Sequence, residues 1–246
     1  MIVYGHRGAQ GEAPENTIAG CKHAVARGVR HLEIDLRLSK DLELVVIHDD
    51  RLKRTARVRG TVLDLTAKEL AKLDARGSGP PWPSKKQTGI PTLHALYQAV
   101  PEIETWQLEL KGGRQSYNEN LVAALAEWLA DDHEGCIVTS SEPSMILAMK
   151  QIIPDLDTGL VSMYPDPTDT LKECDCSHLI AAWATAGNPW LVRSLHRQKI
   201  HISAWTVNDA TAIKNLFRLK IDSIITDYPS MALPLVAALE RKQQRK

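Results

Sequence analysis

Short runs rich in β-branched residues alternate along the chain with segments of helical pattern. This alternation is typical of βα units around a parallel sheet. Nine runs are predicted to be strands: Ile2–Tyr4, His31–Leu36, Leu44–Ile47, Trp106–Leu110, Cys136–Thr139, Thr158–Val161, His178–Ala182, His201–Thr206 and Asp222–Thr226. An α/β barrel closes with eight strands, so either one of the nine runs is not a strand or one strand lies outside the barrel.

Capping signals predict where the intervening helices begin. Thr66 and Glu69, three residues apart, have the spacing of a capping box. Pro143, Pro189 and Pro229 stand at or just before predicted helix starts, where a missing amide hydrogen costs nothing.

Two segments depart from regular alternation. Only seven residues separate Leu36 from Leu44, too few for a crossover helix. If Asp35 and His48 both lie at strand tops, we expect the chain to descend in extended form and climb again. Residues 49–91 have an Arg-rich start, one short helical pattern and a Gly/Pro-rich end, and we interpret them as a small cap-like insertion beside the barrel mouth.

The chain length of 246 residues fits a single domain over 1–246 with a TIM-type (β/α)8 barrel. Lys plus Arg and Asp plus Glu number 30 each, so the protein has no net positive charge that would attract nucleic acid or an anionic membrane. Any affinity for phosphate must come from a local cluster. The sequence shows neither a spanning apolar stretch nor a signal-peptide pattern, and its four cysteines lack zinc-site spacing. We therefore expect a cytoplasmic protein with reduced thiols and no membrane span.

Acidic residues in two predicted strands suggest a metal site. Glu33 and Asp35 alternate with apolar residues in LEIDL, so both carboxylates share one strand face. Inside a barrel they would repel each other and lose hydration, and a hard cation would reverse that penalty. The alternative is an edge strand that exposes its charges to water. Glu109 and Lys111 repeat the spacing, with a surface ion pair as the alternative.

Two histidines also follow predicted strands. His6 lies in YGHRGA beside Arg7, and His48 ends LVVIH. Histidine titrates near neutrality, so such a pair can share acid and base work on a phosphoryl group. The alternative is that each is an ordinary hydrogen-bonding residue. Catalysis is favoured because all four segments end strands, where barrel enzymes hold their sites.

Seven short motifs, taken in order, resemble those of the glycerophosphodiester phosphodiesterase family of the cytoplasmic bacterial type. They are HRG at 6–8, PENT at 14–17, EID at 33–35, HD at 48–49, ELK at 109–111, AWTVN at 204–208 and IITDYP at 224–229. Each is weak alone, but the ordered set spans nearly the whole chain. The resemblance implies metal-dependent hydrolysis of small glycerophosphodiesters to glycerol 3-phosphate and an alcohol.

The resemblance also assigns roles around the reacting phosphate. Glu33, Asp35 and Glu109 match the family's ligands for one divalent cation, Mg²⁺ or Ca²⁺. His6 and His48 match its acid–base pair, and we assign His6 as the base and His48 as the acid. The nucleophile is either the glycerol 2-hydroxyl, with a cyclic intermediate, or water.

Further matches concern substrate binding. Arg7 and Lys111 match the cations that hold the phosphate oxygens, and Trp205 matches the aromatic wall against the glycerol. Asn16 matches a residue that arranges the HRG loop, and Asp227 belongs to a closing-strand motif to which we assign a structural role.

One position departs from the family pattern. Where the family commonly has Ser-Phe after the fifth strand, this chain has Ser141-Glu142, which affects the expected substrate preference rather than the chemistry. Three alternatives remain: a phospholipase-D-like enzyme acting on intact lipids, a cyclising phosphodiesterase, and a catalytically silent phosphate-binding barrel. A lipid enzyme would need an apolar membrane-facing surface, and no such segment stands out in the sequence. The sequence does not assign an oligomeric state.

Overall fold

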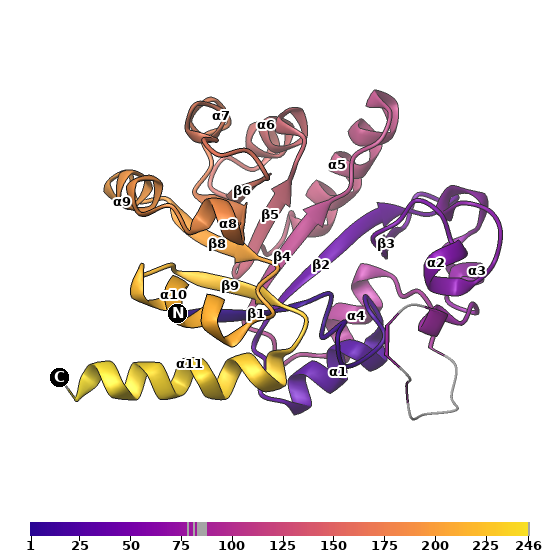
Figure 1. Cartoon of the computed structure of the whole chain (residues 1–246). Helices are drawn as coiled ribbons and strands as arrows, with labels where there is room; N and C mark the ends of the chain where they lie inside the picture. Colours follow the sequence, from indigo (N-terminus) through magenta and orange to yellow (C-terminus); the bar gives the residue numbers. More distant parts are fainter. Residues whose placement is uncertain (78, 81, 83–87, 246) are drawn as a thin grey trace.

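Eight parallel strands close into a barrel in the computed structural model, which describes residues 1–77, 79–80, 82 and 88–245 (Figure 1). Each strand pairs with two neighbours in the order β1-β9-β8-β7-β6-β5-β4-β2, and β1–β2 pairing completes the ring. The barrel strands are β1 (Ile2–His6), β2 (His31–Leu38), β4 (Thr105–Leu110), β5 (Cys136–Ser140), β6 (Asp157–Ser162), β7 (His178–Ala182), β8 (His201–Trp205) and β9 (Ser223–Thr226). The predicted TIM-type fold is confirmed.

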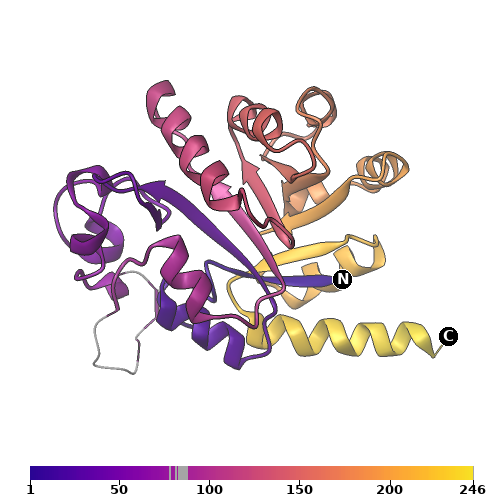
Figure 2. The same ribbon diagram turned by 180° about the vertical axis from the view of Figure 1, so that it is seen from behind.

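The helices that connect the barrel strands, together with the C-terminal helix, lie outside the strands and cover the barrel (Figures 1 and 2). They are α1 (Ile18–Ala26), α4 (Leu93–Ala99), α5 (Gln115–Leu129), α6 (Pro143–Ile152), α7 (Thr168–Glu173), α8 (Trp183–Ala186), α9 (Pro189–Arg197), α10 (Ala210–Arg218) and α11 (Pro229–Gln244). The prolines at 143, 189 and 229 each begin a helix, as predicted. Leu121, Leu125 and Leu129 recur every fourth residue on α5 and are fully buried in the core between helix and strand. Among the described residues, none of the helices has the length and hydropathy needed to cross a bilayer.

The ninth strand, β3 (Leu44–Val46), lies outside the barrel, but the predicted path to it is wrong. β2 continues upward past Asp35 to Leu38, and β3 returns beside it in antiparallel register, with Val46 opposite Leu36. The reason is the availability of a strand edge. β4 pairs with β2 along residues 31–36, whereas β1 pairs with it only through Glu33. A segment that descended beside the lower part of β2 and climbed again would find both edges of β2 occupied, whereas above Glu33 one edge of β2 is open to β3.

The insertion at 49–91 holds four short helices: α2 (Lys53–Ala56), η1 (Val62–Asp64), α3 (Ala67–Leu70) and η2 (Ala75–Gly77). The predicted capping box is present, because the Thr66 hydroxyl accepts from the amide of Glu69. The other short helices were not predicted. Part of the Gly/Pro-rich stretch, at 78, 81 and 83–87, lies outside the described residues.

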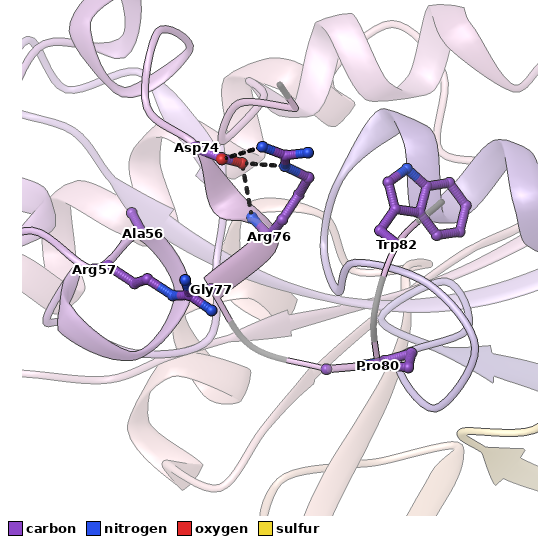
Figure 3. A pocket seen from close by; sticks show the side chains of 8 residues that line it. Ala56, Arg57, Asp74, Arg76, Gly77, Pro80 and Trp82 are labelled. Atoms are coloured by element: carbon purple, nitrogen blue, oxygen red, sulfur yellow. Dashed lines mark hydrogen bonds and ion pairs between the residues drawn. The ribbon is translucent and has the colours of Figure 1, made fainter. Parts of the chain in front are cut away.

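The insertion has its own hydrophobic cluster, which includes Ile47, Leu52, Leu70 and Ile90. It also bears an open pocket of about 600 Å³ (Figure 3). In that pocket an ion pair joins Asp74 to Arg76 across from Trp82, and the lining includes none of the predicted site residues.

Candidate active site

Three carboxylates meet on the inner face of the barrel. Glu33 and Asp35 point inward from β2, and Glu109 on β4 is the direct register partner of Asp35. One oxygen from each lies within 4.8 Å of the others. The edge-strand alternative is excluded, because β2 is paired on both sides and the exposed fractions of Glu33 and Asp35 are 4% and 0%.

Two cations bind the innermost carboxylate. Arg7 Nε lies 2.9 Å from Asp35 Oδ2, and Lys111 Nζ lies 2.9 Å from Asp35 Oδ1 and 2.6 Å from Glu109 Oε1. Burial alone would raise the pKa of Asp35, but Lys111 and Arg7 outweigh it and lower that pKa well below its usual range. The Lys111–Glu109 pair is largely enclosed, so the surface ion-pair alternative is also excluded.

The loop after β1 aims Arg7 at this cluster. Arg7 has a left-handed backbone, with φ of 50°, and its amide donates to the backbone oxygen of Glu33. Asn16, also left-handed at φ 53°, donates from its backbone to Arg7 O and from its side chain to Asp35 Oδ2 at 2.8 Å. The contacts of Asn16 therefore hold the HRG loop against β2.

Glu33 carries the uncompensated charge of the cluster. Burial, and then repulsion from Asp35, raise its pKa. Its Oε2 accepts from the amide of Arg7 at 3.3 Å, whereas its Oε1 is buried without a hydrogen-bond partner among the described residues. An orphaned carboxylate oxygen facing two further carboxylates is the donor set that a hard divalent cation prefers. These residues therefore fit one such ion.

His6 is held by a carboxylate from the far end of the chain. Its Nδ1 lies 2.5 Å from Oδ1 of Asp227, and its Nε2 lies 3.7 Å from Oε2 of Glu33. Burial lowers the pKa of His6, but the bond to Asp227 and the charge of Glu33 raise it to a net value above normal. Gln10 and Asn208 also donate to Asp227. The sequence assigned Asp227 a structural role and gave no sign of this contact.

His48 has an equivalent arrangement. Its Nδ1 lies 2.7 Å from Oδ1 of Asp49, and Arg54 binds both oxygens of Asp49. Arg54 also binds Glu15 at 2.6 and 2.8 Å, and Glu15 accepts from Arg7. Burial lowers the pKa of His48 despite the opposing charge of Asp35. In each histidine, Nδ1 is bound to a carboxylate and Nε2 is left for chemistry.

The cavity above the carboxylates has a charged side and an apolar side. Its volume is about 70 Å³. The charged side comprises His6, Arg7, Glu33, His48, Glu109 and Lys111. The opposite side, here named the apolar wall, comprises Val161, Ile180, Trp205 and Ile225 from β6 to β9. The structure thus brings seven of the eight predicted site residues to one cavity, and the eighth, Asp35, belongs to the acidic cluster beside it.

Sequence reasoning identified Trp205 in this wall but missed the other three members. Their inward positions on strands were visible, but apolar strand residues have the same pattern whether they line a cavity or fill a core. Glu142, which stands where the family commonly has Phe, is exposed. Its side chain packs against Gly112, so that a Cβ added to Gly112 would lie 2.7 Å from Cγ of Glu142.

A barrel that gathers three carboxylates, two cations and two carboxylate-bound histidines at its strand ends has the features of a metal-assisted hydrolase. Residues 6–231 match the model of the glycerophosphoryl diester phosphodiesterase family. The chain belongs to this family and is a phosphoric diester hydrolase that acts on glycerophosphodiesters.

Individual relatives resemble the chain over nearly its full length. It is 30% identical to a glycerophosphodiester phosphodiesterase of Caldanaerobacter subterraneus, covering 96% of this chain and 97% of the relative. It is 27% identical to a Mus musculus protein named lysophospholipase D, covering 92% of this chain and 82% of the relative. An Oleispira antarctica phosphodiesterase solved with the product sn-glycerol-3-phosphate is 26% identical, with a TM-score of 0.87 over 96% of this chain and 97% of that one.

Proposed function

We propose that the enzyme hydrolyses glycerophosphodiesters to glycerol 3-phosphate and an alcohol through acid–base catalysis by His6 and His48. The observation that carries this proposal is the pair of imidazoles, each bound through Nδ1 to its own carboxylate, at one cavity with the acidic cluster. A carboxylate on Nδ1 orients the ring and stabilises its protonated form when Nε2 takes up a proton. The product held by the Oleispira antarctica relative supports the same outcome here.

We assign phosphate binding to Arg7 and Lys111. Both guanidinium and ammonium groups reach the cavity from the charged side and are fixed by Asp35, so they are positioned before substrate arrives. Preorganised positive charge favours the transition state as negative charge builds on the phosphoryl oxygens. Glu33, Asp35 and Glu109 would hold one Mg²⁺ or Ca²⁺, which supplies further polarisation of the phosphate when bound.

His6 acts as the base and His48 as the acid. Strand order supports this assignment: β1, which carries His6, is separated from Trp205 on β8 only by β9, whereas His48 follows β3 on the other side. With the glycerol against Trp205, Nε2 of His6 is on the side of the glycerol hydroxyl or the attacking water. The more exposed His48 protonates the departing alcohol as it leaves.

We further propose that the chain works as one domain over 1–246 with the insertion at 49–91 beside the mouth. The contacts of Arg54 with Asp49 and Glu15 support this arrangement, because they join the insertion to the residues that hold His48 and Arg7. A reducing, cytoplasmic location is supported by four buried free cysteines.

The test is an assay of purified protein with glycerophosphocholine, glycerophosphoethanolamine and glycerophosphoglycerol, each with Mg²⁺ or Ca²⁺. We expect glycerol 3-phosphate to be released, excess EDTA to abolish the release, and one of the two ions to restore it. Phosphorus NMR of the products distinguishes the monoester from a cyclic phosphate. Full activity in excess EDTA would refute the metal site, and an accumulating cyclic phosphate would favour the cyclising alternative.

A further inference from the structure

One side chain crosses the interior of the barrel at the base of the catalytic cavity. Gln107 points inward from β4, is fully buried and lines the cavity. Its Nε2 donates to Oγ of Ser203 on β8 at 3.0 Å. Three strands separate β4 from β8 in either direction around the ring, so this bond joins opposite walls of the barrel. Barrel interiors are usually filled by branched apolar side chains, and a buried amide here departs from that packing.

A chain of hydrogen bonds below the amide fixes which way it faces. Oγ of Ser203 contacts Oγ of Ser223 on β9, and the latter atom lies 3.0 Å from Nε2 of His201. Burial lowers the pKa of His201, so its imidazole is neutral near physiological pH and can accept at Nε2. Each hydroxyl then donates once toward His201 and accepts once from above, and Ser203 accepts from Gln107. The amide nitrogen of Gln107 therefore faces Ser203, and the amide oxygen is turned away.

The second hydrogen on the same nitrogen is also used. Burial raises the pKa of the Tyr4 hydroxyl to about 12, and a side-chain hydrogen bond with Gln107 opposes that rise. A hydrogen bond that lowers the pKa of a phenol is one donated to its oxygen, because it favours the phenolate. In contrast, Oε1 of Gln107 is buried without a hydrogen-bond partner among the described residues. Gln107 thus brings an open acceptor to the cavity that it lines.

Strand order places this acceptor beneath the glycerol part of the substrate. Glu109 follows Gln107 by two residues on β4 and faces the same way. Trp205 follows Ser203 by two residues on β8 in the same manner. The amide therefore spans the barrel one layer below the carboxylate assigned to the metal and the tryptophan assigned to the glycerol. Nε1 of Trp205 donates to the backbone oxygen of Ile180 at 3.2 Å, so the indole offers the glycerol only an apolar face.

We propose that Oε1 of Gln107 accepts a hydrogen bond from the terminal hydroxyl of the glycerol, which makes Gln107 a specificity-determining residue. This inference deepens the proposed function and rests on it. The 2-hydroxyl lies next to the phosphorylated carbon, on the side of His6, so the terminal hydroxyl is the one that needs a partner farther from the phosphate. The apolar wall offers it none. Thr139 is the other uncharged polar residue of the lining, and its hydroxyl is the alternative partner.

The expected size of the effect follows from the loss of one hydrogen bond in a buried site. A site built to bind a substrate hydroxyl discriminates against the analogue that lacks it, because its own polar group is then left unpaired. For one neutral acceptor we expect a preference of about tenfold or more in kcat/KM. The analogue is the phosphocholine diester of propane-1,2-diol, in which the terminal hydroxyl is missing and the 2-hydroxyl remains.

The experiment measures kcat/KM for glycerophosphocholine and for the analogue, through choline release, in the wild type, Gln107→Met and Thr139→Val. Methionine has nearly the length and volume of glutamine but lacks its acceptor. Gln107→Met should bring the preference for glycerophosphocholine close to one, whereas Thr139→Val should retain it. Gln198→Met is the matched control, because Gln198 is exposed at the end of α9 and should keep the preference of the wild type.

Two further measurements separate this role from a structural one and from metal binding. Thermal unfolding shows whether Gln107→Met is folded. Ser203→Ala keeps the acceptor but leaves the amide free to turn, so it should lower the preference without abolishing it. Calorimetric titration with Mg²⁺ and Ca²⁺ should give the wild-type affinity in Gln107→Met, because the amide oxygen is assigned to the glycerol and not to the ion.

The outcomes distinguish this inference from the proposed function. If the wild type hydrolyses glycerophosphocholine and the analogue equally well, the inference is overturned and the proposed function stands. A preference that survives in folded Gln107→Met, is unchanged in Ser203→Ala or disappears in Thr139→Val also overturns it. Weaker metal binding in Gln107→Met would assign the amide oxygen to the ion instead. If the wild type releases no choline from glycerophosphocholine, the proposed function fails, and the inference fails with it.

Discussion

Oδ1 of Asp227 lies 2.5 Å from Nδ1 of His6, joining the last strand of the barrel to the first across 221 positions of sequence. Closing the barrel therefore also orients an imidazole. Because Nδ1 is engaged, Nε2 is the nitrogen that faces Glu33 and the cavity.

Asp227→Asn should lower kcat by about a hundredfold or more with little change in KM, because the amide neither fixes the reactive tautomer nor stabilises the imidazolium. The acidic limb of the pH–rate profile, which reports deprotonation of His6 as the base, should also move to lower pH, because Asp227 raises the pKa of His6. Steady-state kinetics across pH checks both. Asp222→Asn is the matched control, since Asp222 binds Nε2 of His196 at 3.0 Å in an equivalent pair outside the cavity. Unchanged kcat in Asp227→Asn would contradict the positioning role.

Glu33→Gln should raise the dissociation constant for Mg²⁺ or Ca²⁺ by at least about tenfold, by analogy with the loss on altering other metal-site residues. In EDTA the same variant should unfold at an equal or higher temperature than the wild type, because an uncompensated buried charge is gone. Calorimetric titration and thermal unfolding measure the two effects.

Glu119→Gln is the control for the loss of one negative charge, since Glu119 is an exposed carboxylate that accepts a hydrogen bond from Gln115. Unaltered metal affinity in Glu33→Gln would remove Glu33 from the ligand set.

Burial, and then repulsion from His201, lower the pKa of His178 on the barrel wall. A histidine whose folded pKa is depressed binds its proton more readily when unfolded, so the free energy of unfolding falls as pH falls below about 6.5. Urea denaturation in EDTA measures the free energy of unfolding at pH 7.5 and at pH 5.5. The fall between these two pH values should be smaller for His178→Gln than for the wild type. His94→Gln, at an exposed histidine, should lose as much as the wild type. Equal losses in all three proteins would rule out this contribution.

Arg54 joins the insertion to the site through Asp49 and Glu15. Arg54→Met should lower kcat by about tenfold, because Asp49 is then free to turn away from His48. Arg51→Met is the control from the same segment, with an exposed side chain. If Arg54→Met kept the kcat of the wild type, the contact between the insertion and Asp49 would not contribute to catalysis.

Local pattern predicted the alternation of strands and helices and the strand face that the acidic residues share, but it left open whether that face was buried. Alternation in LEIDL put Glu33 and Asp35 on one face, and β2 does present both inward. The route to β3 was wrong, because it depends on how far β1 and β4 each pair along β2, which is a property of the closed sheet.

Contacts between distant segments were equally invisible to the sequence. Nothing in IITDYP indicates that Asp227 meets His6, and nothing distinguishes Val161 in a cavity wall from a core valine. By contrast, Asp49 adjoins His48 in the chain, so that pairing had a local signal that went unused.

The most direct test of the account is the rate of glycerol 3-phosphate release by His6→Ala and His48→Ala at saturating substrate and metal, with thermal unfolding measured in parallel. Each variant should lose about a hundredfold or more in kcat and remain folded, because general acid–base catalysis contributes about that much. If either folded variant retained more than about a tenth of wild-type kcat, paired catalysis by the two histidines would be contradicted.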